Sequence, residues 1–169
     1  MNRLALLITC LASPACVALA LGAGAASADT YDDADITVTT YTVDGETLGD
    51  IETQMTAEGP QGFWAYTTWT VNWNDACETT VNAAITLPEL AEDTALSDAD
   101  AEEFARMRAA LEAHELQHVE IGLAYAAETE AQGCPTAFEP ILDTFLADER
   151  AFDAETEHGR TQGVYLTAD

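Results

Sequence analysis

Hydrophobic and polar positions alternate along much of the N-terminal half, which is typical of β-strands. Residues 34–43 are rich in β-branched side chains, and alternation continues through residues 62–74 and 81–87. Asn74-Asp75 is a turn signal between the last two segments. We therefore expect three strands, the last two joined as a hairpin, with Pro88 ending the third.

A short helix is expected between the first two strands. Leu48, Ile51 and Met55 recur at the three- and four-residue spacing of a helix face. Gly59-Pro60 follows directly and should end the helix, since neither residue favours its continuation.

The C-terminal half changes to a helical period. Ser97 with Asp100 three residues later resembles a capping box and predicts the start of a long helix, which should end near Gly133. A second helix is expected from about Pro140 to His158-Gly159. The face of the long helix is formed by Phe104, Met107, Leu111, His114, His118, Ile121 and Tyr125. Strands followed by helices indicate an α+β fold, with a small antiparallel sheet, then a long helix and a second C-terminal helix.

Composition narrows the function. The chain has 169 residues, enough for one domain, with 31 acidic side chains against five basic ones and a net charge of −26. Binding a phosphate backbone or an anionic membrane needs basic side chains. We therefore expect no nucleic-acid partner and no membrane association of the mature form.

The N-terminus resembles an export signal. Arg3 precedes an apolar stretch over residues 4–21, and Ala26-Ser27-Ala28 fits a cleavage site. We expect residues 1–28 to be a signal peptide and residues 29–169 a single exported domain, periplasmic or extracellular. A membrane anchor is the alternative, because the apolar stretch approaches spanning length.

Two cysteines, Cys77 and Cys134, remain beyond the expected signal peptide. A pair of cysteines in an exported domain favours a disulfide, which would stabilise the fold by about 4 kcal/mol in the chain-entropy model. Two buried free thiols are the alternative.

The segment His114-Glu115-Leu116-Gln117-His118 is an H-E-x-x-H motif on the long predicted helix. Residues four apart lie on one helix face, so His114 and His118 can occupy two corners of a Zn²⁺ tetrahedron. Glu115 points beside the metal, where it can accept a proton from metal-bound water. The alternative is that both histidines are neutral core residues on the apolar stripe.

A catalytic zinc needs a third protein ligand. The extended metzincin motif is absent, because position 121 is Ile and position 124 is Ala. His158 is the remaining histidine and is our candidate. The alternative is a glutamate on the following helix, as in gluzincins. The glutamates available for that role are Glu128, Glu139, Glu149 and Glu155.

These residues resemble a bacterial family of predicted secreted zinc-dependent proteases, long described as a domain of unknown function. The resemblance runs from about Tyr41 to Tyr165. It is carried by Tyr41-Thr42-Val43-Asp44-Gly45, Gly59-Pro60, the Trp-rich strand, Cys77, Leu87-Pro88, the H-E-x-x-H motif, Cys134 and Asp153-x-x-Thr156-x-His158-Gly159. It implies a zincin-like fold and places His158 at the family's downstream histidine. Position 152 is Phe where the family usually has Tyr.

Other polar residues near His158 are candidates for supporting roles. Asp153 and Thr156 are expected to orient His158 or another ligating histidine. Arg160 and Tyr165 are weaker candidates for stabilising an oxyanion.

Together these features predict an exported zinc-dependent peptidase with a peptide or protein substrate. The substrate would lie extended along a sheet edge. The main alternative is an exported zinc-binding module without catalysis, and a partner-binding domain without metal is a third hypothesis.

Overall fold

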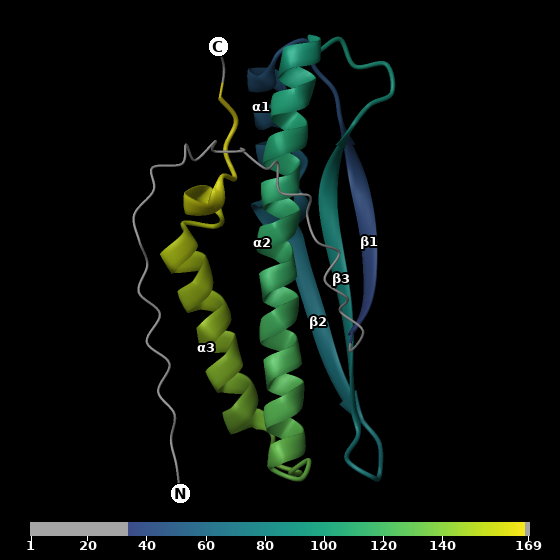
Figure 1. Cartoon of the computed structure of the whole chain (residues 1–169), viewed down its shortest axis with the longest axis vertical. Coiled ribbons are helices and arrows are strands. Elements are labelled where there is room, and N and C mark those ends of the chain that lie inside the picture. Colours follow the sequence, from purple (N-terminus) through teal and green to yellow (C-terminus); the bar gives the residue numbers. More distant parts are fainter. Residues whose placement is uncertain (1–33, 168–169) are drawn as a thin grey trace, which may run out of the picture. The chain divides into compact units, whose positions relative to one another are not determined.

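The computed structural model describes residues 34–167, so the expected signal peptide over residues 1–28 lies outside the described residues. The fold is α+β, as the sequence predicts, and its elements follow the expected order (Figure 1). They are β1 (Ala34–Val43), α1 (Leu48–Glu58), β2 (Tyr66–Trp73), β3 (Thr79–Leu90), α2 (Asp98–Ala131) and α3 (Glu139–Thr156), with 3-10 turns over Pro60–Gly62 and Arg160–Gln162.

The three strands form a mixed sheet in the order β1-β3-β2. β2 and β3 pair in antiparallel fashion, which confirms the predicted hairpin. The expectation of a wholly antiparallel sheet is wrong, because β1 runs parallel to β3, with Ala34 opposite Val81 and Val43 opposite Leu90. A parallel pair needs a crossover connection, and α1 lies in the long connection that brings this about. β2 is thereby left as an edge strand.

β3 is longer than predicted and continues through Pro88 to Leu90. A proline cannot donate to a ladder, but β2 pairs with β3 only as far as Thr86. Pro88 therefore lies where β3 has a neighbour on one side only, opposite Tyr41 of β1. This explains why the strand does not end there.

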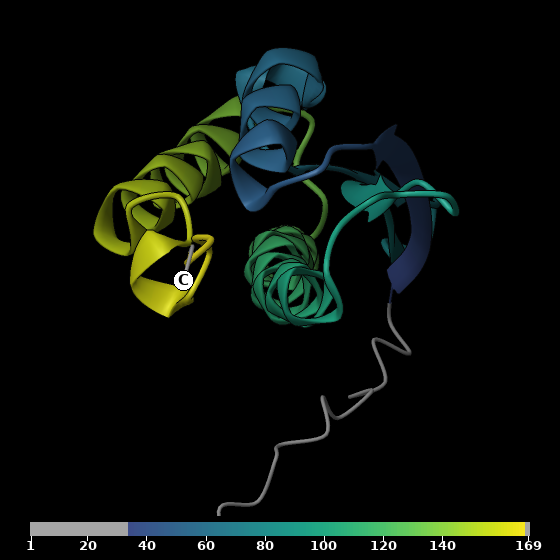
Figure 2. The same cartoon turned by 90° about the horizontal axis from the view of Figure 1, so that it is seen from above.

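The long helix α2 packs against β2 and β3, and α3 packs against α2 (Figure 2). Ser97 caps α2 by accepting a hydrogen bond from the backbone N–H of Asp100. The core contains inward side chains of β3, α1 and α2: Val81, Ala83, Ile85, Leu87, Ile51, Met55, Phe104, Met107 and Leu111. The packing of this apolar face fixes the rotation of α2 about its axis.

The predicted disulfide is present. Cys77, in the turn between β2 and β3, bonds to Cys134 just after α2, with the two Cα atoms 5.6 Å apart. The bond ties one end of the sheet to one end of α2. Among residues 34–167, no helix combines the length and apolarity needed to span a bilayer.

Candidate metal centre

The two histidines of the H-E-x-x-H motif lie on the buried face of α2. Their ring centroids are 5.0 Å apart, and the side chains of His114 and His118 are 4% and 10% exposed. They continue the stripe of Met107 and Leu111. The packing that holds α2 against the sheet therefore also aims both imidazoles.

Asp153 of α3 faces both rings. Its Oδ1 lies 3.4 Å from Nε2 of His114 and 3.2 Å from Nε2 of His118. One ligand atom from each of these residues lies within 4.8 Å of the others. With bonds of about 2.0–2.2 Å, two ligands of a tetrahedral Zn²⁺ are about 3.3–3.6 Å apart. The two distances from Asp153 to the histidines fit one such ion.

The hydrogen-bond partners of the two imidazole rings also favour a bound cation. Nδ1 of His114 lies 2.9 Å from Oε1 of Gln162, and Nδ1 of His118 contacts a carboxylate oxygen of Glu149. Both partners accept, so the protons of neutral rings belong on Nδ1. Both Nε2 lone pairs then face the Asp153 carboxylate, and a shared cation resolves this repulsion.

Glu149 is held in place from the sheet side. Nε1 of Trp69 donates to Oε1 of Glu149 over 2.6 Å. The indole lies against α2 at Gly122, where a Cβ would come within 2.8 Å of the ring. A chain of contacts therefore runs from Gly122 through Trp69 and Glu149 to His118.

His114 is supported from the C-terminal side. The Phe152 ring stacks on its imidazole, with centroids 4.8 Å apart. Gly159 has a φ of 81° and approaches so closely that a Cβ would lie 3.1 Å from Cγ of His114. Gly159 thus allows the turn after α3 to pass against the ring, and Gln162 follows on that turn.

Glu115 lies beside the histidines and is 5% exposed. Its Oε2 accepts a hydrogen bond of 2.7 Å from the Thr67 hydroxyl of β2. Burial raises the pKa of the Glu115 carboxyl, although the Thr67 hydrogen bond opposes the rise. A carboxyl of this kind is a stronger base than an exposed glutamate.

The two histidines differ in basicity. Burial lowers the pKa of His114, which keeps the ring neutral. Burial also acts to lower the pKa of His118, but the hydrogen bond and charge of Glu149, with the charge of Asp153, outweigh it and the pKa is raised. Protons will therefore compete with a metal for His118 as the pH falls.

His158 lies at the rim of the same site. Its Nδ1 is 3.6 Å from Oδ1 of Asp153, its side chain is 57% exposed, and its ring packs on Phe63 with centroids 5.3 Å apart. His158 is therefore beside Asp153 but outside the group of three converging donors. Its role as third ligand stays a prediction.

Thr156, Arg160 and Tyr165 each contact a neighbouring residue. The Thr156 hydroxyl donates to the Phe152 carbonyl and accepts from the Gly159 N–H, so it supports the turn that carries His158. Arg160 pairs with Glu157. Tyr165 lies under the guanidinium of Arg106.

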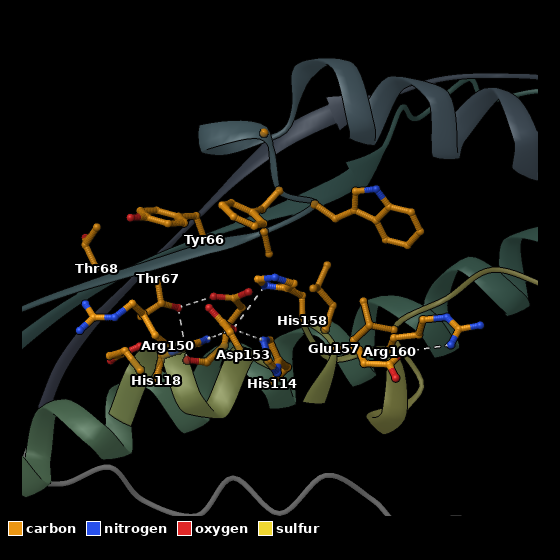
Figure 3. A pocket seen from close by; sticks show the side chains of 18 of the residues that line it. Tyr66, Thr67, Thr68, His114, His118, Arg150, Asp153, Glu157, His158 and Arg160 are labelled. Carbon is orange, nitrogen blue, oxygen red and sulfur yellow. Dashed lines mark hydrogen bonds and ion pairs between the residues drawn. The ribbon is translucent and has the colours of Figure 1, made fainter. Parts of the chain in front are cut away.

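A cavity of about 740 Å³ opens over the centre (Figure 3). Residues 62–69, leading into and along β2, form one wall, and the α3 face from Leu142 to Asp153, with Glu157 just after the helix, forms the other. His114, Glu115 and His118 line it from α2. The open edge of β2 and the candidate centre thus share one cavity.

Residues 38–159 match the model of the protein family described as bacterial protein of unknown function (DUF922). The chain belongs to DUF922. No curated protein and no solved structure matches it. The DUF922 segment contains His114, His118, Asp153 and His158 but ends before Gln162.

The sequence does not distinguish Gln162 or Thr67 from their neighbours, and it suggests Glu149 only as a metal ligand. Gln162 lies beyond the DUF922 segment, on a turn whose path depends on Gly159. Thr67 is one of many threonines in the strands, and only its position opposite Glu115 distinguishes it. The half-buried Trp69 with its polar Nε1 is the one available signal for Glu149, since an indole N–H shielded from water needs an acceptor.

Proposed function

We propose that this protein is an exported zinc-dependent peptidase in which His114, His118 and Asp153 hold Zn²⁺ and Glu115 is the general base. The observation that carries the proposal is the convergence of the Nε2 atoms of His114 and His118 on Oδ1 of Asp153, at 3.4 and 3.2 Å. Two imidazoles and a carboxylate are the ligand set of many catalytic zinc sites, which keep a further position open.

Zinc bound here would lower the pKa of a water molecule and polarise a carbonyl group. Glu115 would take the proton from that water and deliver it to the leaving amine. The raised pKa of Glu115 suits both steps, because the same carboxyl group must first accept a proton and then donate it near neutral pH. Thr67 orients the carboxylate through its hydrogen bond.

The cavity supports a polypeptide substrate. β2 is an edge strand of the sheet, and eight consecutive residues of the chain, Gly62 to Trp69, line the cavity. An extended peptide can pair with such an edge while its side chains occupy the cavity. The disulfide agrees with an oxidising compartment outside the cytoplasm.

Zinc content and peptide cleavage together test the proposal. We expect elemental mass spectrometry to find one zinc ion per chain. We also expect the protein to cleave peptides of an unbiased library. Glu115→Gln should keep zinc and lose activity by about 10²–10⁴-fold, because proton transfer alone contributes that much. Glu112→Gln on the exposed side of α2 is the matched control and should remain active.

Other outcomes decide against the peptidase. Zinc without cleavage would favour the non-catalytic zinc module, and protein that binds no zinc would exclude both. Equal cleavage by wild type and Glu115→Gln would overturn the mechanism. Activity lost on chelation counts only if circular dichroism shows the fold intact, since zinc also stabilises folds.

A further inference from the structure

One end of the cavity contains an arginine without a partner. Arg106, Arg108 and Arg160 each pair with a nearby glutamate. Within residues 34–167 the structure gives the guanidinium of Arg150 no ion pair and no hydrogen bond to a described residue, although the chain has 31 acidic residues. An exposed, unpaired guanidinium that lines a cavity is available to a ligand.

Arg150 is close to the candidate centre. It precedes Asp153 on α3 by three residues, or about one helical turn, so both side chains lie on the cavity side of the helix. In Figure 3 its guanidinium lies toward Thr68 of β2, at the opposite end of the cavity from Arg160, with His158 between the two arginines. Leu142, Leu146 and Trp69 also line the cavity and supply apolar surface.

The other charges of the cavity are mostly engaged. Glu149 bonds to His118 and Trp69, Asp153 faces the two histidines, and Glu157 pairs with Arg160. Glu115 is buried against Thr67. Glu52 of α1 is the other lining charge for which the described residues provide no partner. Among the described residues that line the cavity, Arg150 thus has the one guanidinium that remains to recognise a substrate.

We propose that Arg150 forms a carboxylate-binding subsite that selects peptides with an acidic side chain or a free C-terminus near the scissile bond. The inference rests on the proposed function. A guanidinium binds a carboxylate through two parallel hydrogen bonds, so the subsite distinguishes carboxylate from amide. A helical turn rises about 5 Å and an extended peptide about 3.3 Å per residue. The carboxylate therefore belongs within about three residues of the cleaved bond.

The charge of the whole chain makes this contact selective. The net charge of −26 repels acidic peptides at long range, but such repulsion is screened beyond about 8 Å at physiological ionic strength. A direct contact with Arg150 is screened much less. Without Arg150, none of the described residues that line the cavity offers an unpaired guanidinium to a carboxylate of the peptide.

Matched peptides test the subsite. One set of peptide pairs tests recognition of a side-chain carboxylate. The two peptides of a pair differ only by Glu or Gln, at one of three positions on either side of the cleaved bond. Pairs with a free or amidated C-terminus report on the terminus. We expect wild type to prefer one class of carboxylate by about tenfold or more in kcat/KM. Arg150→Gln should remove the preference, and Arg150→Glu should favour Lys at the same position.

Arg108→Gln is the control, because it changes the net charge equally but does not line the cavity. It should retain the wild-type preference. Peptide binding to the inactive Glu115→Gln protein, with and without Arg150→Gln, gives a readout independent of turnover. Cleavage with no Arg150-dependent preference would overturn the subsite and leave the peptidase. Arg150-dependent binding without wild-type cleavage would overturn the peptidase and leave the subsite, and the absence of both would overturn both.

Discussion

The Asp153 carboxylate of α3 lies 3.2 Å from Nε2 of His118 on α2, although the two residues are 35 positions apart in the sequence. Asp153 is therefore expected to be a metal ligand rather than only an orienting residue. Asp153→Asn should weaken zinc binding by more than the 10–100-fold typical of lost outer contacts. His158→Gln should have a smaller effect, because His158 lies outside the converging donors.

Competition with a zinc chelator measures both affinities, and Asp148→Asn on α3 is the matched control. The opposite order of effects, with zinc lost in His158→Gln and kept in Asp153→Asn, would support His158 as the third ligand.

Glu149 is expected to tune the centre through His118. The charge of Glu149 raises the pKa of His118 and so makes Nε2 of this ring a better metal ligand. Glu149→Gln removes that charge. Zinc affinity should fall by about 10–100-fold. Glu155→Gln, an exposed change on the same helix, should leave the affinity unchanged, and equal values for the two variants would contradict the role of Glu149.

Gly122 should be required for the packing of Trp69. A Cβ at this position would meet the indole ring at 2.8 Å, so Gly122→Ala should lower the free energy of unfolding by about 1–3 kcal/mol. Gly49→Ala in α1 would place its Cβ 3.7 Å from the Thr47 hydroxyl oxygen, an ordinary contact, and should be neutral or stabilising by up to about 1 kcal/mol. Urea unfolding compares the two, and a stable Gly122→Ala protein would show that Trp69 adjusts.

The disulfide should contribute substantially to stability. Replacing Cys77 and Cys134 together by Ser should lower the free energy of unfolding by about 4 kcal/mol. Reductant should lower the stability of wild type to a similar extent and leave the double variant unaffected. A reductant-insensitive wild type would argue against the bond.

Tyr41 should make the fold sensitive to high pH. Burial, and secondarily the charge of Glu58, raises the pKa of Tyr41 to about 12, and its hydroxyl donates to the Trp64 carbonyl over 2.7 Å. An unfolded tyrosine ionises near pH 10, so between about pH 10 and 12 the unfolded state loses its proton first. The free energy of unfolding should therefore fall across that range.

Tyr41→Phe should be less stable at neutral pH but lack this part of the alkaline decline. Tyr66→Phe, at an exposed tyrosine, should behave as wild type. Urea midpoints at pH 9 and pH 12 measure both, and an unchanged decline in Tyr41→Phe would assign it to other groups.

The sequence by itself determined the local elements and the first part of the site. Helical spacing from Ser97 to Gly133 predicts α2 within about two residues, and the four-residue spacing places His114 and His118 on one face with Glu115 beside them. The alternation over residues 62–74 and 81–87 predicts the hairpin, and two cysteines predict their bond. These features follow from contacts between residues close in sequence, or from a single possible pairing.

Only the tertiary structure decided the rest. The parallel pairing of β1 with β3 depends on which side of the central strand β1 occupies after the crossover, and no local pattern specifies that side. The meeting of Asp153, Glu149 and Gln162 with the two histidines depends on how α3 packs on α2 and on the left-handed turn at Gly159. A helical period states which face is buried, but the partner that covers that face is chosen by packing between distant segments.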